Sequence, residues 1–154
     1  MLHRAVFVPS TDDKLKIMLK LAKPRKKDKI IDLGCGDGKI IFALAKQGFN
    51  VVGVEINPFL VKKCQKKAKE LKLEKSVTIV NNSFWNLNLS KYDLVFLYGT
   101  AYIMERLEKK LQKELKPGSR IISNYFQFPQ WSVEKKENEV RVYEVTPATL
   151  RSEI

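Results

Sequence analysis

The stretch Asp32-Leu33-Gly34-Cys35-Gly36-Asp37-Gly38 decides the fold class of this 154-residue chain. With Lys29-Ile30-Ile31 before it, its first two residues form a strand pattern, Lys29 to Leu33, and it precedes residues 39–46 (KIIFALAK), which have helical spacing. Glycines permit positive φ angles and let a ligand approach the backbone without a Cβ in the way. The N-terminus of the following helix presents free N–H groups to polar or anionic ligand atoms. The stretch therefore predicts a strand, a glycine turn and a helix that together bind a ligand.

The rest of the chain alternates short β-branched runs with longer helical patterns, as parallel α/β proteins do. Strand runs occur at 29–33, 50–55, 76–80, 92–98, 120–128 and 140–145, and helical spacing occurs after Ser10-Thr11, at 39–46, from Pro58 and over 103–115. We expect a Rossmann-like α/β fold with a mostly parallel central sheet of roughly six to seven strands, helices on both faces and an antiparallel last strand. Only one clear strand follows 120–128, so the seventh strand stays open. The length fits a single domain, 1–154, with a loop and helix at 1–24 and a core at 28–154.

The spacing of the glycines discriminates between cofactors. A dinucleotide fold uses G-x-G-x-x-G, whose third glycine lets helix and strand pack closely beside the pyrophosphate. Here the motif is G-x-G-x-G, and Lys39 stands where that third glycine would fall. A cofactor without a pyrophosphate needs room only for its methionine and ribose portions. The motif therefore favours S-adenosylmethionine (SAM) over a nicotinamide dinucleotide.

Side chains at the ends of the predicted strands complete the predicted cofactor site. Glu55 ends the second strand about 20 residues past the glycines, where a carboxylate can accept hydrogen bonds from both ribose hydroxyls; a solvated strand end is the alternative. Asp32 can chiefly hold the glycine loop through backbone N–H groups. Ser83 can bond the adenine amino group, and Phe84 can either stack on the ring or belong to the core. The predicted cofactor-binding residues are Asp32, Gly34, Cys35, Gly36, Gly38, Glu55, Ile56, Ser83 and Phe84.

Composition narrows the partners and the location. The net charge of +12 points to an anionic partner such as RNA, an acidic protein or a membrane surface, although lysines also simply solvate a surface. Cys35 and Cys64 have neither metal-ligand spacing nor a disulfide framework, so we expect no metal. His3 is the only histidine, which argues against Cys–His nucleophilic catalysis. No signal peptide and no apolar run of about 20 residues occurs, so we expect no transmembrane segment and, with the two unpaired cysteines, a location in the cytoplasm. No apolar helix is left over for an interface, so we expect a monomer.

From Val6 to about Tyr143 the sequence resembles a small lysine-methyltransferase family within the class I methyltransferases. That family includes an archaeal broad-specificity protein lysine methyltransferase and the mitochondrial enzymes that modify the ATP synthase c-subunit and the adenine nucleotide translocator. The resemblance is carried by residues 6–11 (VFVPST), 32–40 (DLGCGDGKI), 52–58 (VGVEINP), 107–111 (LEKKL), 114–118 (ELKPG) and 126–131 (FQFPQW). At Ser83 the chain departs from its relatives, which carry Asp or Asn.

The resemblance implies a class I methyltransferase fold and methyl transfer from SAM to lysine ε-amino groups of proteins. This displacement needs a neutral amine, so a channel that desolvates the lysine helps. We place Tyr98, our candidate catalytic residue, at the wall of that channel, with Pro9, Ser10, Thr11 and Trp131 flanking its opening; residues 1–24 then lie on the substrate side. For Tyr98 and Trp131, the alternative is that they close the edge of the sheet.

Two further functions stay open at this point. The first is RNA methylation, with tRNA or rRNA held by a basic helix face, although residues 97–100 read Leu-Tyr-Gly-Thr where adenine-N6 enzymes carry Asn/Asp-Pro-Pro-aromatic. That face consists of Lys62, Lys63, Lys66, Lys67, Lys69 and Lys72, which can equally form a solvated surface. The second is a non-catalytic SAM-binding module, which the intact glycine loop and Glu55 do not favour.

Overall fold

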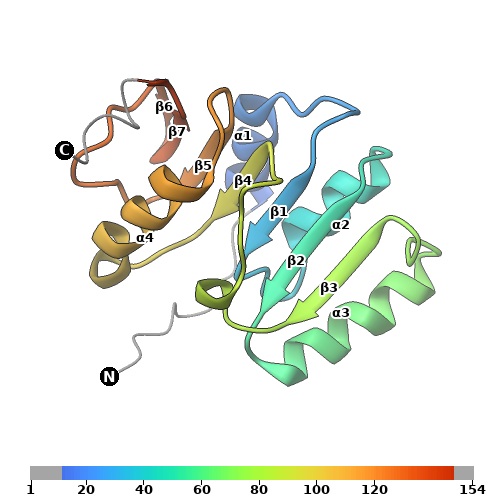
Figure 1. Ribbon diagram of the computed structural model, residues 1–154. Helices are drawn as coiled ribbons and strands as arrows, with labels where there is room; N and C mark the ends of the chain where they lie inside the picture. The colour runs from blue at the N-terminus through green and yellow to red at the C-terminus, as the bar shows by residue number, and fades with distance from the viewer. Residues whose placement is uncertain (1–11, 148–154) are drawn as a thin grey trace.

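The computed structural model describes residues 12–147 and arranges them as alternating strands and helices (Figure 1). The helices are α1 (Asp12–Ala22), α2 (Lys39–Lys46), α3 (Pro58–Glu70), the 3-10 helix η1 (Phe84–Asn86) and α4 (Ala101–Glu114). The strands are β1 (Ile30–Leu33), β2 (Val51–Glu55), β3 (Val77–Asn81), β4 (Leu94–Leu97), β5 (Arg120–Asn124), β6 (Lys135–Glu137) and β7 (Val140–Glu144). Within residues 12–147, none of the helices combines the length and apolar character that crossing a bilayer needs.

The seven strands form one sheet in the order β3-β2-β1-β4-β5-β7-β6. The pairs β3–β2, β2–β1, β1–β4 and β4–β5 are parallel, whereas β7 runs antiparallel to both β5 and β6. The predicted mostly parallel sheet with an antiparallel last strand is therefore confirmed. Strand order reverses between β1 and β4, and in such sheets ligands bind beyond the carboxyl ends of the strands at that point.

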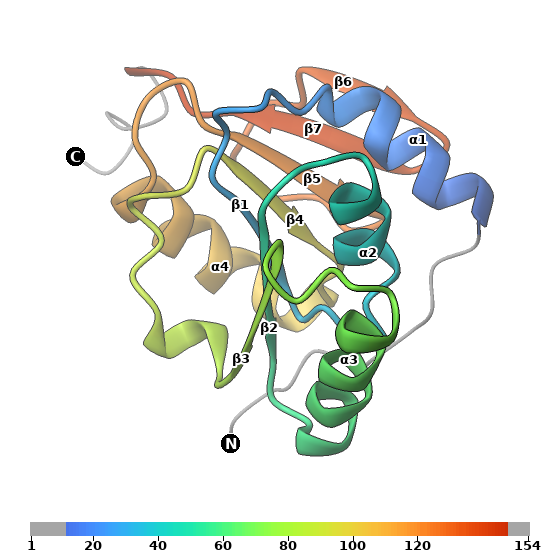
Figure 2. The same cartoon turned by 90° about the vertical axis from the view of Figure 1, so that its right-hand side faces the viewer.

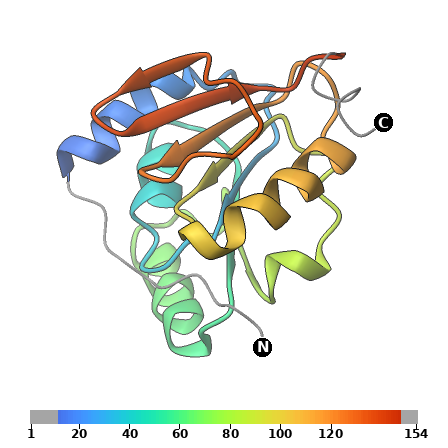
Figure 3. The same cartoon turned by 90° about the vertical axis from the view of Figure 1, so that its left-hand side faces the viewer.

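Helices cover both faces of the sheet, as the sequence predicts (Figures 2 and 3). Apolar residues of α1, α2 and α3, such as Met18, Phe42 and Cys64, share one buried cluster with strand residues. Residues Met104, Leu107 and Leu111 of α4 belong to a second cluster with the opposite side of the strands. The spacing of apolar residues predicted this arrangement because it placed one apolar stripe on each helix.

The connection between β3 and β4 contains only the short helix η1, so no long helix covers the outer surface of β2 and β3 on the α4 side. Val52 and Val80 are half-buried there, and Thr78 is exposed. Thr78 pairs with Val52 across the two strands, and both lie near the amino ends of their strands. The amino-terminal part of this face therefore stays open.

The strands agree with those expected from the sequence to within one or two residues at each end, with two larger differences. The predicted strand 120–128 ends at Asn124, because Tyr125 takes a left-handed φ of 78° and turns the chain. The seventh strand, β6, is the three-residue segment Lys-Lys-Glu at the edge of the sheet. Such a short charged edge strand carries none of the alternation by which strands are recognised in sequence.

Candidate cofactor site

The candidate site lies where β1, β2, β3 and β4 end, at the point where strand order reverses. The glycine loop follows β1, Glu55 is the last residue of β2, Asn81 is the last of β3, and Tyr98 comes directly after β4. The topology thus brings together the segments that sequence analysis selected one by one.

The glycine loop needs its glycines for two different reasons. Gly34, Gly36 and Gly38 all take positive φ angles, of 80°, 58° and 90°. A Cβ at Gly38 would lie 2.6 Å from the Phe42 ring, whereas nothing lies within 4 Å of a Cβ at Gly34. Gly38 therefore lets the loop pack on α2, while Gly34 faces open space, where a ligand can approach the backbone.

Glu55 is the side chain that holds the glycine loop. Its carboxylate is buried, with 7% of the residue exposed, and accepts hydrogen bonds from the N–H of Gly36 (3.0 Å) and the N–H of Asn57 (2.8 Å). Burial is at odds with the alternative of a solvated strand end. Each carboxylate oxygen keeps a further lone pair with which to accept a hydrogen bond from a ligand hydroxyl.

Asp32 does not hold the glycine loop through backbone N–H groups as predicted. Its residue is 3% exposed, and within residues 12–147 no hydrogen bond reaches its carboxylate, so the structure gives the backbone bonds of the loop to Glu55 instead. Burial, and secondly the negative charge of Glu55, raise the pKa of Asp32 from 3.8 to about 7. In its ionised form, a carboxylate in so dry a place favours a cationic or hydrogen-bond-donating ligand beside it.

Cys35 and Cys64 fix the other side of the loop. The Cys64 thiol donates to the carbonyl of Gly36 at 3.3 Å, and the Cys35 side chain packs on Gly53. A hydrogen bond between the two thiols, together with burial, raises the pKa of Cys35, so this residue stays a neutral thiol. Cys35 can therefore contribute to a ligand site through its backbone, not as a nucleophile.

The segment after β3 carries Ser83 and Phe84. The Ser83 hydroxyl accepts from the N–H of Trp85 at 3.3 Å and so caps η1, and Phe84 is half-buried against the Trp85 ring. Asn81 was missed from the sequence: its side-chain amide donates to the carbonyls of Glu55 and Ile56 at 3.0 and 3.2 Å. An asparagine at a strand end was the available signal. Asn81 orients the segment on which Glu55 and the 42% exposed Ile56 lie.

Tyr98 lies half-buried at the end of β4, with its ring edge-on to Phe126 at 6.0 Å between centroids. In the part of the chain that the structure describes, its hydroxyl makes no hydrogen bond, so it can serve a ligand. Pro9, Ser10 and Thr11 lie outside the described residues.

Trp131 lies in the core and not at an opening. It is 5% exposed, packs on Phe128 and Tyr143, and donates its indole N–H to the carbonyl of Glu144 at 3.2 Å. A residue so enclosed has no surface to offer a substrate, so we do not retain it as a substrate-binding residue. The alternative, in which it closes the sheet edge, accounts for these contacts.

Helix α4 anchors the two loops that flank this end of the sheet. Glu108 accepts hydrogen bonds from the N–H groups of Gln130 (2.9 Å) and Trp131 (3.0 Å). Lys110 donates to the carbonyl of Leu87 at 2.6 Å and pairs with Glu114 at 2.7 Å. The charged residues of the LEKKL and ELKPG segments therefore position the loops after β3 and β5.

The residues present fit SAM. A loop with open space at Gly34, a buried acceptor pair at Glu55 and the carboxylate of the buried Asp32 match a ligand with ribose hydroxyls and a net positive charge. Among residues 12–147 no group of three His, Cys, Asp or Glu side chains is arranged to hold a metal ion.

Comparison with known proteins identifies the family to which the chain belongs. The model of the ANTKMT methyltransferase domain matches residues 32–135. Over 126 residues the chain is 35% identical to the ATP synthase c-subunit lysine N-methyltransferase of Mus musculus, covering 82% of this chain and 51% of that protein. Over 129 residues it is 36% identical to a protein-lysine N-methyltransferase of Saccharolobus islandicus, covering 82% of this chain and 80% of the relative.

Among solved structures, an RNA methyltransferase from Salinibacter ruber in complex with S-adenosyl-L-homocysteine superposes with a TM-score of 0.81. It is 32% identical and covers 90% of this chain and 93% of its own. The chain spans about half the length of the curated methyltransferases that are named for the ATP synthase c-subunit. The matched family model covers the glycine loop, Glu55 and α4 together. The chain therefore belongs to the ANTKMT methyltransferase family, within the SAM-dependent methyltransferases of class I fold.

Proposed function

We propose that this chain transfers methyl groups from SAM to lysine ε-amino groups of proteins. The observation that carries the proposal is its similarity to the archaeal relative named a protein-lysine N-methyltransferase, which extends over 80% of that relative. Most of that archaeal relative therefore corresponds to the fold of this chain. The longer relatives, named for the ATP synthase c-subunit, are also lysine N-methyltransferases by name.

The chain's own residues have separate tasks in this proposal. Bound SAM supplies a methyl group on a positively charged sulfur. The glycine loop and Glu55 hold the ribose side, and the Asp32 carboxylate, ionised above pH 7, balances the positive charge. Tyr98, after β4, and Phe126, after β5, form an aromatic wall that lowers the local polarity and favours a neutral lysine amine over its ammonium form. The Tyr98 hydroxyl, which makes no hydrogen bond to residues 12–147, orients that amine.

The remaining expectations are proposals of the same kind. Pro9, Ser10 and Thr11 contact the substrate from the segment before α1, and 1–154 acts as one domain and as a monomer. We propose the cytoplasm as its location, supported by the two adjacent free thiols of Cys35 and Cys64, which suit a reducing compartment.

RNA methylation is the second candidate, because the Salinibacter ruber structure is described as an RNA methyltransferase and is similar over nearly its whole chain. The segment after β4 reads Leu97-Tyr98-Gly99-Thr100 and lacks the prolines that grip an exocyclic amine. We therefore favour lysine.

The test is methyl transfer from isotope-labelled SAM into a cell lysate cleared of small metabolites, divided for protease or nuclease digestion. We expect label that resists nuclease, disappears with protease and is recovered as methyl-lysine after acid hydrolysis. Label removed by nuclease would establish RNA methylation instead, and SAM binding without any transfer would establish a non-catalytic module. As a matched variant, Tyr98→Phe should lower the transfer rate while leaving the SAM dissociation constant unchanged.

A further inference from the structure

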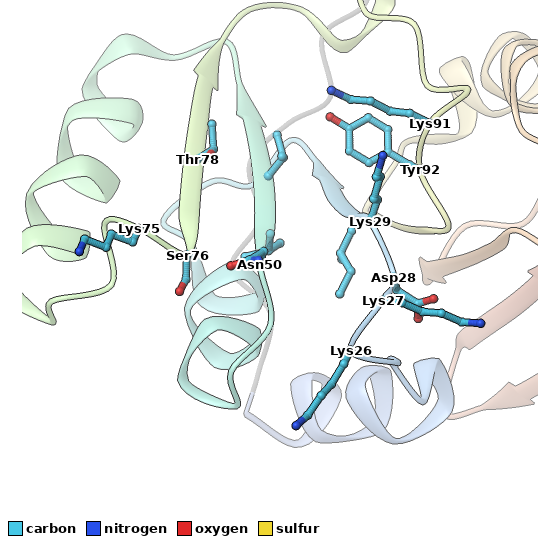
Figure 4. A pocket seen from close by; sticks show the side chains of 13 residues that line it. Lys26, Lys27, Asp28, Lys29, Asn50, Lys75, Ser76, Thr78, Lys91 and Tyr92 are labelled. Atoms are coloured by element: carbon cyan, nitrogen blue, oxygen red, sulfur yellow. The ribbon is translucent and has the colours of Figure 1, made fainter.

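A hollow of about 310 Å³ lies at the opposite end of the sheet from the glycine loop (Figure 4). Residues at or just before the amino ends of β1, β2, β3 and β4 line it, so it occupies the open part of the face that no long helix covers. Its described lining consists of Lys26, Lys27, Asp28, Lys29, Ile30, Asn50, Val51, Val52, Lys75, Ser76, Thr78, Lys91 and Tyr92. The strands set it roughly 15 Å from the cofactor site, at about 3.3 Å per strand residue.

The charge around this hollow is strongly unbalanced. Five lysines line it, all exposed: three from the segment before β1, one before β3 and one before β4. Among the described residues none of their ammonium groups has a carboxylate within 4 Å. The one acidic lining residue, Asp28, is already engaged, since it pairs with Arg120 at 2.9 Å and accepts from the N–H of Arg25 at 2.7 Å. The hollow thus carries positive charge that the carboxylates of residues 12–147 do not neutralise.

We propose that this hollow binds the phosphodiester backbone of a single-stranded nucleic acid. Lysine ammonium groups act as point charges toward phosphate, and they come here from three separated chain segments, as a strand crossing the hollow requires. Asn50, Ser76 and Thr78 add neutral hydrogen-bonding side chains between them. Tyr92, the aromatic residue of the described lining, is buried and offers no exposed face on which bases can stack. Binding therefore follows the backbone rather than the sequence.

A strand bound here is a tether and not the methyl acceptor, because the cofactor site lies at the other ends of the same strands. The surface also differs from the lysine face of α3, which lies beside β3 on the other side of the sheet. The two surfaces can therefore be separated by mutation.

Salt dependence gives the expected size of the effect. For a single strand, the binding constant falls about 0.7 of a decade per phosphate contact for each tenfold rise in salt. Five lysine contacts therefore predict a slope of about −3.5 in a plot of the logarithm of the binding constant against the logarithm of the salt concentration. Removing three of the five contacts should reduce the slope to about −1.4 and, at 0.1 M salt, weaken binding roughly 100-fold.

The test measures fluorescence anisotropy of a labelled 12-nucleotide oligouridylate, and of the matching oligothymidylate, with the full-length chain at several salt concentrations and without SAM. The hollow variant is Lys26→Glu, Lys75→Glu and Lys91→Glu. The matched control is Lys62→Glu, Lys63→Glu and Lys69→Glu on α3, which lowers the net charge by the same amount. We expect the hollow variant to show the weaker binding and shallower slope, and the control to behave as the wild type. The oligonucleotide that binds more tightly shows whether the hollow prefers RNA or DNA.

Equal loss of binding in both variants would overturn the proposal, because net charge alone would then explain it. So would a poly-glutamate 12-mer that binds as tightly as the oligonucleotides and is lost in the hollow variant, since the site would then recognise acidic proteins. Circular dichroism melting confirms that each variant folds, and a Lys→Gln set at the same positions replaces any that does not. The readout needs no methyl transfer, so its outcome is independent of the proposed function.

Discussion

Replacing Asp32 by asparagine should make the cofactor-free protein more stable at alkaline pH. The fold raises the pKa of this carboxyl from 3.8 to about 7, so the unfolded chain gives up the proton at lower pH than the folded one. The folded state then binds more protons between these values, and stability falls as pH rises. The stabilising effect of the neutral carboxyl is complete below about pH 4 and is lost as pH passes 7.

The size of the effect follows from the two pKa values. The pKa is raised by about three units, and each unit corresponds to 1.36 kcal/mol. At pH 8 the ionised carboxyl therefore lowers the free energy of unfolding of the wild type by about 4 kcal/mol, of which roughly 3 kcal/mol arises above pH 5. The amide of the variant carries no charge to desolvate, so it escapes this pH-dependent cost. Urea denaturation of wild type and Asp32→Asn at pH 5 and pH 8 measures both free energies of unfolding.

We expect the stability advantage of Asp32→Asn to grow by about 3 kcal/mol from pH 5 to pH 8. An advantage that stays constant or shrinks over this range would refute the reasoning. Asp93→Asn is the matched control: burial raises the pKa of Asp93, but hydrogen bonds from Lys29 and Lys116 outweigh it and leave that pKa lowered, so its dependence on pH has the opposite sign. The stabilised Asp32→Asn variant should also bind SAM more weakly at pH 8 in calorimetry, because it has no charge to offer the ligand.

Three further outcomes follow from other contacts of the site. Glu55→Gln should raise the SAM dissociation constant by roughly 10- to 100-fold, the worth of a charge-assisted hydrogen bond, and calorimetry that found unchanged affinity would remove Glu55 from the ribose site. Glu108→Ala should lower the free energy of unfolding by about 1–3 kcal/mol, because two backbone N–H groups lose their acceptor. Glu108→Gln should recover part of that loss, and the fluorescence of Trp131 should report the loosened loop. Gly38→Ala should destabilise the fold by roughly 1–3 kcal/mol through its positive φ and the contact with Phe42, and a thermal melting temperature equal to that of the wild type would contradict this.

The central sheet and its helices could be predicted from sequence because their signals are local. The helix 39–46 and the inward residues Val61, Cys64 and Ala68 of α3 agree with the structure, since helical periodicity and capping act within a few residues. Strand β6 escaped prediction because its three charged residues carry no alternation of apolar and polar side chains, and only their backbone pairing with β7 makes them a strand. The end of β5 was overestimated because the aromatic run continues past the turn at Tyr125.

The candidate site shows the same division. Which residues gather at the strand ends followed from topology, and Glu55 lies beside the glycine loop, where its position at the end of a predicted strand placed it. Which carboxylate holds the loop could not be read from sequence, because it depends on the three-dimensional approach of Glu55 to Gly36. Trp131 was placed at an opening because amphipathic aromatics suit both a rim and a core, and only the contacts with Phe128 and Tyr143 decide between them.

The attachment of Gly36 on both sides has a kinetic consequence. Glu55 fixes its N–H and Cys64 fixes its carbonyl within the fold itself, so the glycine loop has little conformational entropy left to lose when a ligand binds. Association then needs no slow closing of this loop, and differences in affinity among variants fall mainly on the dissociation rate. The residence time of the spent cofactor on this loop, rather than the speed of its capture, then sets how soon the next molecule can enter.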